Sequence, residues 1–290
     1  MSHQTSKIFL CTLAIIGFVV MVPISEAQAQ RPSGPPKRSI KKVTGDIYRY
    51  QNNFHFGMLV ETKDSIVVTD PINAGVVKWL RGEIKKRFNK PVSHAIYSHS
   101  HGDHNTGGEE WGKEVEVIAH EKLRAEVLSG KARTGYPTQV FQDEMVFRLG
   151  GKTFELKYLG IGHGTDLIAM VVRPENVAFI VDLASKNRLP FRNFPRTDID
   201  GLINQVKTAE SLKFKTLIPG HGGVGTHAHL KSFRIYIETL RSRVAAGLKA
   251  GKSAGDLVKS VTMSEYKNWD GYKFFRAANV KGMAAWLQKK

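Results

Sequence analysis

The chain has 290 residues, of which 41% are hydrophobic, so it is long enough for one large or two small globular domains with a substantial core. Its formal net charge is +17, but lysine and arginine are scattered along the whole chain rather than collected in one block. We therefore expect a solvated basic surface and no nucleic-acid partner. The single cysteine, Cys11, excludes a disulfide framework.

The first 29 residues have the order of a secretory signal. Lys7 precedes the apolar run 8–22, and a small-x-small cleavage site ends at Ala29. The alternative is an uncleaved membrane anchor, against which Pro23 and the short apolar run both argue. We predict a periplasmic or secreted mature chain that begins at Gln30 and keeps no stable membrane span. Because Cys11 lies inside the signal, thiol catalysis and thiolate metal sites are excluded from the mature protein.

Beyond the signal, residues 30–43 are polar, Pro-rich and basic, which is typical of a flexible tether. From Gly45 onward, short β-patterned runs alternate with segments of helical periodicity, and this alternation predicts an α/β layered domain. The expected strands cover 47–50, 57–61, 65–69, 94–98, 115–119, several runs between 139 and 172, 177–181 and 216–218, and the expected helices cover 74–88, 121–128 and 198–212.

The end of the chain has a different pattern. Helical periodicity dominates 226–290, with expected helices over 229–248 and 255–261, and no internal repeat is visible. We expect a helical C-terminal extension packed on a domain over 44–225. The aromatic residues of this extension are interpreted as a packed cap over the core rather than a ligand-binding box: Tyr266, Trp269, Tyr272, Phe274, Phe275 and Trp286.

One short segment carries most of the chemical information. His99, His101, Asp103 and His104 lie within six residues, directly after the predicted strand 94–98. Residues two apart in an extended chain project the same way, so His99 and His101 can converge on one metal ion. Gly102 permits a sharp turn, after which Asp103 and His104 can serve a second ion. Imidazole and carboxylate ligands without thiolate suit zinc, with manganese, iron or cobalt as substitutes.

This His-x-His-x-Asp-His motif resembles the signature of the metallo-β-lactamase superfamily. The resemblance covers about 45–225 and implies an αβ/βα four-layer sandwich, in which two sheets lie between outer helices and the metal site lies at one end of the sheets. Three later residues match the family pattern in order and context. They are His163 in Gly-His-Gly-Thr, Asp182 after an apolar strand, and His221 in Pro-Gly-His-Gly.

The resemblance also implies a ligand set for two Zn²⁺ ions per chain. One ion is assigned to His99, His101 and His163, and the other to Asp103, His104 and His221. Asp182 is expected to bridge them. Asp182 follows Val181, where hydrolases of the family with a bridging carboxylate commonly have glycine, so a structural carboxylate that caps the next turn is the alternative for Asp182.

Several residues outside this set are candidates for supporting roles. Asp70 matches a family position behind the metal loop, and Thr165 and Asp166 could support His163; a plain turn or cap role is the alternative for each. Three cationic side chains follow the predicted bridge and could hold a substrate carboxylate, although a solvated loop is also possible: Lys186, Arg188 and Arg192. His55 could line the mouth of the site, while His227 and His229 lack the pairing required of ligands.

The function expected from these residues is that of an exported dinuclear zinc hydrolase. A metal-bound hydroxide would cleave a lactam, lactone, ester or thioester bond in a small, possibly anionic molecule, and Asp103 could orient the hydroxide and pass a proton to the leaving group. The motif does not select the substrate. The alternatives are an iron-dependent dioxygenase acting on a sulfur substrate, a nucleic-acid processing enzyme, and a non-catalytic binding protein. The nucleases of the family commonly have a large insert, for which the interval between Asp182 and His221 leaves no room.

Overall fold

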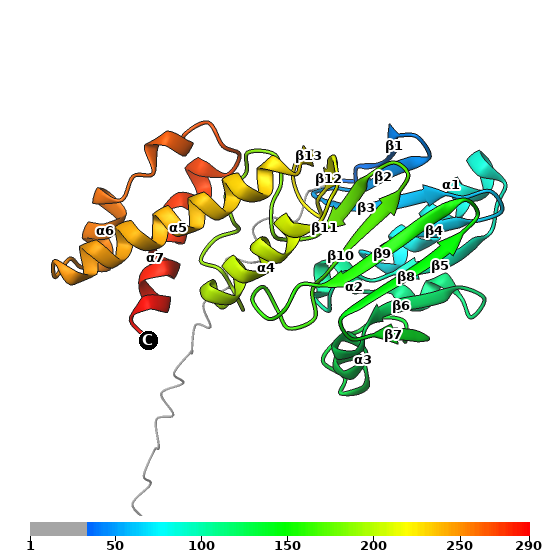
Figure 1. The fold of residues 1–290 in the computed structure, drawn as a ribbon, viewed down its shortest axis with the longest axis horizontal. Coiled ribbons are helices and arrows are strands. Elements are labelled where there is room, and N and C mark those ends of the chain that lie inside the picture. The colour runs from blue at the N-terminus through cyan, green and yellow to red at the C-terminus, as the bar shows by residue number, and fades with distance from the viewer. Residues whose placement is uncertain (1–33) are drawn as a thin grey trace, which may run out of the picture. The chain divides into compact units, whose positions relative to one another are not determined.

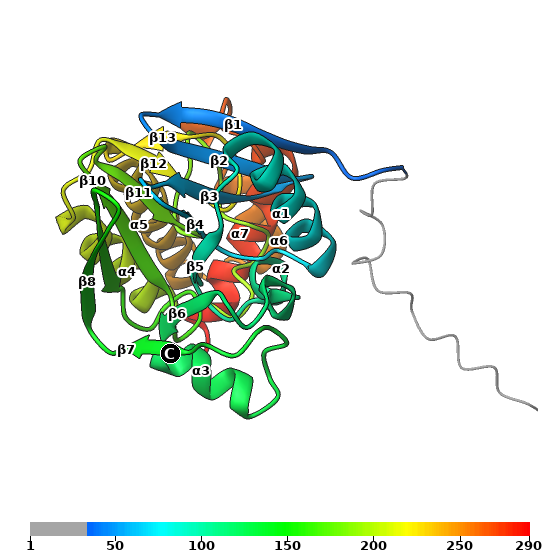
Figure 2. The ribbon, with the colours of Figure 1, turned by 90° about the vertical axis from the view of Figure 1, so that its right-hand side faces the viewer.

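Two β-sheets lie against each other at the centre of the structure, a computed structural model that describes residues 34–290 (Figures 1 and 2). The predicted signal, 1–29, lies outside the described residues. The strands of the first sheet, in spatial order, are β1 (Arg38–Thr44), β2 (Ile47–Asn52), β3 (His55–Glu61), β4 (Ile66–Val68), β5 (Val92–Ile96), β6 (Glu116–His120) and β7 (Gln139–Phe141). The strands of the second are β13 (Gly225–Thr226), β12 (Thr216–Ile218), β11 (Val177–Ile180), β10 (Ile168–Arg173), β9 (Lys152–Tyr158) and β8 (Glu144–Leu149).

Strand β1 corrects the prediction of a tether over 30–43. Residues from Arg38 onward pair antiparallel with β2 and form an edge of the first sheet. The only buried residue of β1 is Ile40, so the strand has almost no apolar pattern to detect. The strand is held instead by backbone hydrogen bonds to β2. Side-chain polarity does not predict such bonds.

The helices cover the outer faces of the sheets, as the four-layer prediction requires (Figure 2). Helix α1 (Ala74–Phe88) buries Val76, Val77 and Leu80 against the first sheet. Its N-cap is Asn73, whose side chain accepts a hydrogen bond from the Val76 amide, and this capping explains why the helix starts there. Helix α3 (Glu121–Leu128) also packs on this sheet, and α4 (Ile199–Ser211) and α5 (Ala228–Lys249) cover the second. The α/β sandwich is therefore confirmed.

The space between the sheets holds the larger hydrophobic core. Strand β10 is buried along almost its whole length, and Met58 from β3 and Phe154 from β9 meet it from the two sheets. Strands of this kind, buried on both faces, have continuous apolar sequences rather than an alternating pattern, which is how 177–181 was recognisable.

The C-terminal helices extend this core. Helices α5, α6 (Ala254–Ser260) and α7 (Tyr272–Leu287) contact one another and lie beside the second sheet, at the left of Figure 1. The aromatic residues expected to cap the core do pack against it, with one exception: the side chain of Phe274 is 81% exposed, so its assignment to the cap is wrong. Phe274 and Phe275 are consecutive on a helix, and only one of such a pair can face the core.

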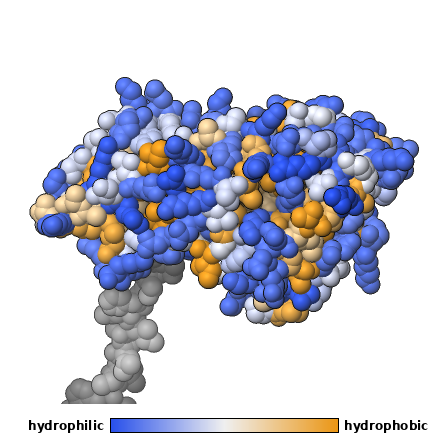
Figure 3. Space-filling view, viewed as in Figure 1, coloured by the Kyte–Doolittle hydropathy of each residue, from blue (hydrophilic) through white to orange (hydrophobic). Residues whose placement is uncertain are grey.

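None of the helices in the described part of the chain is both long enough and apolar enough to cross a bilayer. The face of the molecule in Figure 3 is mainly hydrophilic, with apolar side chains in separate patches. This surface is typical of a folded domain that keeps its apolar residues inside.

A glycine in β3 leaves room for the buried tyrosine of the neighbouring strand β2. Gly57 pairs with Tyr50, and a Cβ atom at Gly57 would lie 2.1 Å from the ring of Tyr50. We expect Gly57→Ala to lower the free energy of unfolding by about 2 kcal/mol, because the buried ring cannot move aside in a close-packed core. Chemical denaturation measures this change.

Gly82 provides the matched control. It lies exposed in α1, and a Cβ there meets no atom within 4 Å. Gly82→Ala should raise stability by up to about 1 kcal/mol through helix propensity alone. Equal effects of the two substitutions would contradict a steric role for Gly57.

Candidate metal centre

Four of the predicted ligands lie in one turn after β5. Strand β5 ends at Ile96, and the chain then passes through His99 to the short helix α2 (Gly102–Asn105). His101 precedes α2 with an extended backbone, and its carbonyl accepts hydrogen bonds from the amides of His104 and Asn105. This tight turn points Asp103 and His104 in a different direction from the two histidines before it, as the residue spacing predicted.

The other three predicted ligands follow strands of the second sheet. Strands β9, β11 and β12 run in the same direction, since β10 is antiparallel to both β9 and β11, and β11 is parallel to β12. Their carboxyl ends therefore meet at one edge of the sheet. His163, Asp182 and His221 lie just beyond these three ends, so strand direction explains why residues so distant in sequence come together.

The seven side chains form two groups that share one residue. His99, His101, His163 and Asp182 offer ligand atoms that all lie within 4.8 Å of one another. The same holds for Asp103, His104, Asp182 and His221. The structure thus brings together all seven residues, in the two sets that the sequence suggested.

The carboxylate of Asp182 occupies the centre of this arrangement. Its Oδ2 lies 3.2 Å from His163 Nε2 and 3.4 Å from His99 Nε2. Its Oδ1 lies 3.3 Å from His104 Nε2 and 3.4 Å from His221 Nε2. Each oxygen therefore faces a different group of imidazoles, which is the geometry a bridging ligand needs. The backbone of Asp182 has φ 58°, a left-handed conformation that aspartate tolerates better than most residues.

Several ligand atoms lack the partners that buried polar atoms normally have. Among the described residues, His99 Nε2 and Asp182 Oδ1 are buried and have no hydrogen-bond partner. His104 Nε2 and His221 Nε2 lie only 3.0 Å apart. Unsatisfied nitrogen and oxygen atoms aimed at common points, all of them types that zinc and similar ions prefer, fit a metal site.

The electrostatics agree with a cation site. Burial, together with the neighbouring His99 and His163, lowers the pKa of His101 to about 3, so its imidazole stays neutral and able to coordinate. Burial alone would also lower the pKa of His104, but the negative charges of Asp182 and Asp103 outweigh burial and raise that pKa to about 9. The carboxylates of Asp182 and Asp103 thus favour a positive charge at the position of His104.

Asp70 lies behind the turn that follows β5 and holds this turn in place by hydrogen bonds. Its carboxylate accepts hydrogen bonds from the amide of Ser98 at 2.7 Å and from the Ser98 hydroxyl at 2.6 Å. Ser98 Oγ lies 2.9 Å from His99 Nδ1, and Asn105 donates to both Asp70 and the His99 carbonyl. Asp70 therefore acts on His99 through Ser98, while it lies 3.8 Å from His104 Nδ1 directly. Ser98 and Asn105 were missed, although both flank the motif.

His163 is supported by different residues from those expected. Thr165 is exposed and its carbonyl accepts a hydrogen bond from Tyr158, but within the described residues its side chain makes no hydrogen bond to His163. The Thr197 hydroxyl lies 3.4 Å from His163 Nδ1, and Gln205 accepts a hydrogen bond from the His163 amide at 2.6 Å. No local pattern in the sequence marks Thr197 or Gln205. Asp166 is buried, and neither of its carboxylate oxygens has a hydrogen-bond partner within the described chain.

The loop that carries His221 is attached to the turn between β2 and β3. His221 Nδ1 lies 3.0 Å from the carbonyl of Phe54, and the amide of Phe56 donates to the Gly220 carbonyl at 2.9 Å. From the same turn, His55 Nε2 lies 3.5 Å from Asp103 Oδ2. His55 thus lies at the mouth of the site, as its sequence position suggested. Burial alone would raise the pKa of Asp103, but hydrogen bonds from His221 and His55 outweigh it and hold that pKa well below its usual range.

The three cationic residues proposed to hold a substrate differ in their surroundings. The guanidinium of Arg188 forms an ion pair with Asp270 at 2.8 Å, so it is already occupied, and its expected role as a carboxylate-binding group is not supported. Lys186 is exposed, and Arg192 lies over the ring of Phe191 at 5.1 Å from the ring centroid. The sequence could not show the pair with Asp270, because the two residues are far apart in the chain.

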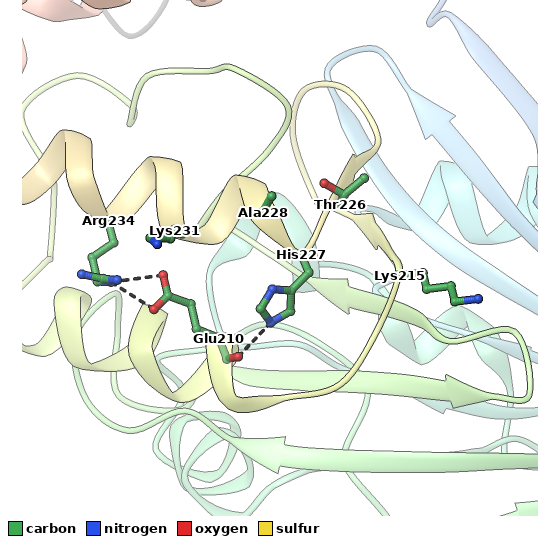
Figure 4. A pocket seen from close by; sticks show the side chains of 7 residues that line it. All are labelled: Glu210, Lys215, Thr226, His227, Ala228, Lys231 and Arg234. Carbon is green, nitrogen blue, oxygen red and sulfur yellow. Dashed lines mark hydrogen bonds and ion pairs between the residues drawn. The ribbon is translucent and has the colours of Figure 1, made fainter.

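A separate hollow of about 740 Å³ lies between the end of α4 and the start of α5 (Figure 4). None of the seven predicted ligands lines it. His227 Nε2 lies 2.8 Å from the carbonyl of Glu210, and Arg234 pairs with the Glu210 carboxylate at 3.1 Å. His229 accepts a hydrogen bond from the Thr226 amide at the start of α5. Both histidines that the sequence left out of the metal site therefore have structural contacts of their own.

Comparison with known proteins places this geometry in a family. A family model described as "Metallo-beta-lactamase superfamily" matches residues 58–221. The α subunit of 2,4-dinitroanisole O-demethylase from Nocardioides sp. (strain JS1661) is 25% identical over 186 residues, covering 62% of this chain and 55% of that protein. A metallo-beta-lactamase type 2 from Elizabethkingia meningoseptica is 26% identical over 144 residues, covering 47% of this chain and 57% of that protein. The matches thus span little more than half the length of these two relatives.

Solved structures show the same fold. A metallo-beta-lactamase from Pontibacter korlensis superposes with a TM-score of 0.63 at 20% sequence identity, covering 70% of this chain and 99% of that one. The family match includes every residue of the two ligand groups, from His99 to His221. The chain belongs to the metallo-β-lactamase superfamily, and its histidine and aspartate cluster is the metal-binding site of that fold.

Proposed function

We propose that the protein is an exported hydrolase that uses two zinc ions to cleave a lactam, lactone, ester or thioester bond in a small molecule. The observation that carries this proposal is the pair of ligand groups joined by Asp182. His99, His101 and His163 would hold one ion, and Asp103, His104 and His221 the other, with Asp182 bridging them. All seven side chains are nitrogen or oxygen ligands, which favours zinc.

When bound, the two ions would acidify a water molecule and polarise the substrate carbonyl. The chain's own residues supply the rest of the chemistry. Asp103 is the least buried of the ligands, with 49% of its side chain exposed, and its Oδ2 faces both His221 and His55. Because its pKa is held low, Asp103 is a carboxylate, and its Oδ2 can take up a proton from the attacking water and pass it to the leaving group on the open side of the site.

The surroundings of the site favour a small and possibly anionic substrate. Lys186 and Arg192 lie in the loop that follows Asp182, and neither side chain is buried. Their charges would attract a carboxylate, and the scattered basic residues elsewhere would add a weaker general attraction. We do not expect a nucleic-acid partner, because the basic residues are not gathered into one block along the chain.

The relatives support a hydrolase but do not identify the type of bond that it cleaves. One is a metallo-beta-lactamase and another is a subunit of an O-demethylase. The predicted signal would place the enzyme in the periplasm or outside the cell, where a lactam or another envelope-accessible compound is available. The fold itself does not choose among these substrates.

Metal content tests the dinuclear assignment first. Mature protein purified without added metal should contain about two zinc ions per chain, because two complete ligand sets are present. His101→Ala should reduce this content sharply, since it removes one imidazole from the first set. Elemental analysis measures both. One iron per chain would instead favour oxidation of a sulfur substrate and would overturn the hydrolase.

The bridge has its own test. Asp182→Asn should weaken zinc binding at both positions by at least about tenfold. Substitution of residues that only orient a ligand already lowers metal affinity by about that factor. Asp103→Asn should weaken binding at one position only. Competition with a chromogenic chelator separates the two cases, and Asp64→Asn, on an exposed turn, is the matched control. Loss at a single position in Asp182→Asn would rule out a bridging role.

The proton role of Asp103 predicts a loss of rate. Asp103→Asn, assayed with saturating zinc on a panel of lactams, lactones and esters, should lower kcat about 10²-fold or more, in the range typical of general acid–base groups. Asp64→Asn should leave kcat unchanged. A wild-type kcat in the zinc-loaded Asp103→Asn enzyme would exclude proton transfer by this carboxylate.

A further inference from the structure

The loop 183–197 connects the parts of the metal centre. It begins next to Asp182, and the amide of Lys186 donates to the carbonyl of Gly223, two residues beyond His221, at 3.3 Å. The loop ends at Thr197, which forms a β-bridge with His163 and places its hydroxyl at His163 Nδ1. The conformation of this loop therefore bears on three of the residues proposed to hold metal.

The backbone of this loop departs from the local preferences of its residues. Arg192, Phe194 and Arg196 have φ values of 46°, 55° and 55°, in the left-handed region that residues other than glycine rarely occupy. Non-glycine residues held in this region persist when the surrounding structure determines them. The contacts that hold the loop in place must then come from outside it.

Helix α7 supplies those contacts at one buried residue. The side chain of Asn279 is fully buried, and its Nδ2 donates to the carbonyl of Pro190 at 3.1 Å and to the carbonyl of Arg192. Its Oδ1 accepts a hydrogen bond from Tyr236 of α5 at 2.7 Å. The amide oxygen thus faces α5, and both donor hydrogens of Nδ2 are held by the two loop carbonyls themselves.

A glycine one turn further along α7 gives independent evidence of the same contact. A Cβ atom at Gly282 would lie 2.5 Å from the carbonyl oxygen of Asn193 and 2.7 Å from its Cα. Residues 279 and 282 share a face of the helix. Glycine weakens a helix, and its place here is explained by the loop backbone, which lies directly against it.

We propose that Asn279 is a positioning residue of the metal centre, which acts through loop 183–197 and Thr197 on the orientation of His163. This inference rests on the proposed function in one respect, the role of His163 as a metal ligand. It makes the C-terminal helices part of the active site's framework, although they contribute no ligand to it.

The link from Thr197 to His163 has a defined chemistry. The Thr197 hydroxyl donates to the carbonyl of Pro195 at 3.1 Å, so its oxygen is left to accept a hydrogen from His163 Nδ1. A proton on Nδ1 leaves Nε2 unprotonated, and Nε2 is the atom that faces Asp182 at 3.2 Å. The loop thus selects the tautomer of His163 that can bind a metal.

The test uses four substitutions in the full mature chain. Asn279→Asp removes the donors to the loop but keeps the acceptor for Tyr236, and Gly282→Ala displaces the loop while improving the helix. Thr197→Val removes only the contact between the Thr197 hydroxyl and His163 Nδ1. Tyr236→Phe is the matched control, because it disturbs the contact between α5 and α7 without removing the donors to the loop.

Two readouts need no substrate. The first is the rate of tryptic cleavage in the loop, mapped by mass spectrometry at Lys186, Arg188, Arg192 and Arg196. The second is zinc affinity, measured by competition with a chromogenic chelator. Asn279→Asp and Gly282→Ala should speed loop cleavage and weaken zinc binding about tenfold, as loss of a residue that orients a ligand does. Thr197→Val should weaken zinc binding alone, and Tyr236→Phe should change neither readout.

The outcomes separate this inference from the proposed function. Wild-type cleavage and zinc affinity in both Asn279→Asp and Gly282→Ala would overturn the positioning role. So would equal changes in Tyr236→Phe, which would indicate a general packing effect of α5 on α7. Wild-type protein that binds zinc but hydrolyses no lactam, lactone or ester would overturn the proposed hydrolase and leave the positioning role standing.

Discussion

Four imidazoles converge on the carboxylate of Asp182, and the rest of the structure is arranged so that they can. His99 and His104 follow a strand of the first sheet, whereas His163 and His221 follow strands of the second. Bringing them within 3.4 Å of one carboxylate requires the two sheets to pack with their strand ends at the same edge. A buried carboxylate without cationic partners is very unfavourable, so this cluster is complete only when the surrounding positive charge is present.

The metal centre is held in place by polar contacts that come from several layers of the fold. Asp70 fixes the turn after β5 through Ser98, and the turn between β2 and β3 holds the loop of His221. Helix α7 holds the loop that ends at Thr197, whose hydroxyl lies at His163 Nδ1. Each contact replaces water around a buried polar group, which gives the site one defined geometry before any ion binds. The C-terminal helices thus belong to the site as well as to the core.

Where the sequence-based predictions failed, the physical reasons differ. The strand Arg38–Thr44 is almost entirely polar, and its position depends on backbone pairing with β2, which side-chain patterns do not report. Thr165 was expected to support His163 because it is near in sequence, yet Thr197 has that contact through a loop that folds back. Arg188 was proposed to hold a substrate carboxylate, but it pairs with Asp270, and this pairing depends on the placement of the C-terminal segment.

The sequence alone determined the helices and buried strands, because apolar periodicity reflects the burial of one face or of both. It also contains the cluster from His99 to His104, whose side chains suit a metal ion, and its resemblance to a known family implied the three later candidate ligands. Only the tertiary structure decided which nitrogen of each histidine faces the centre, which carboxylate oxygen serves which group, and that Thr197, Gln205 and Asn279 support the site. These depend on contacts between segments far apart in the chain, and such contacts leave no pattern in any one segment.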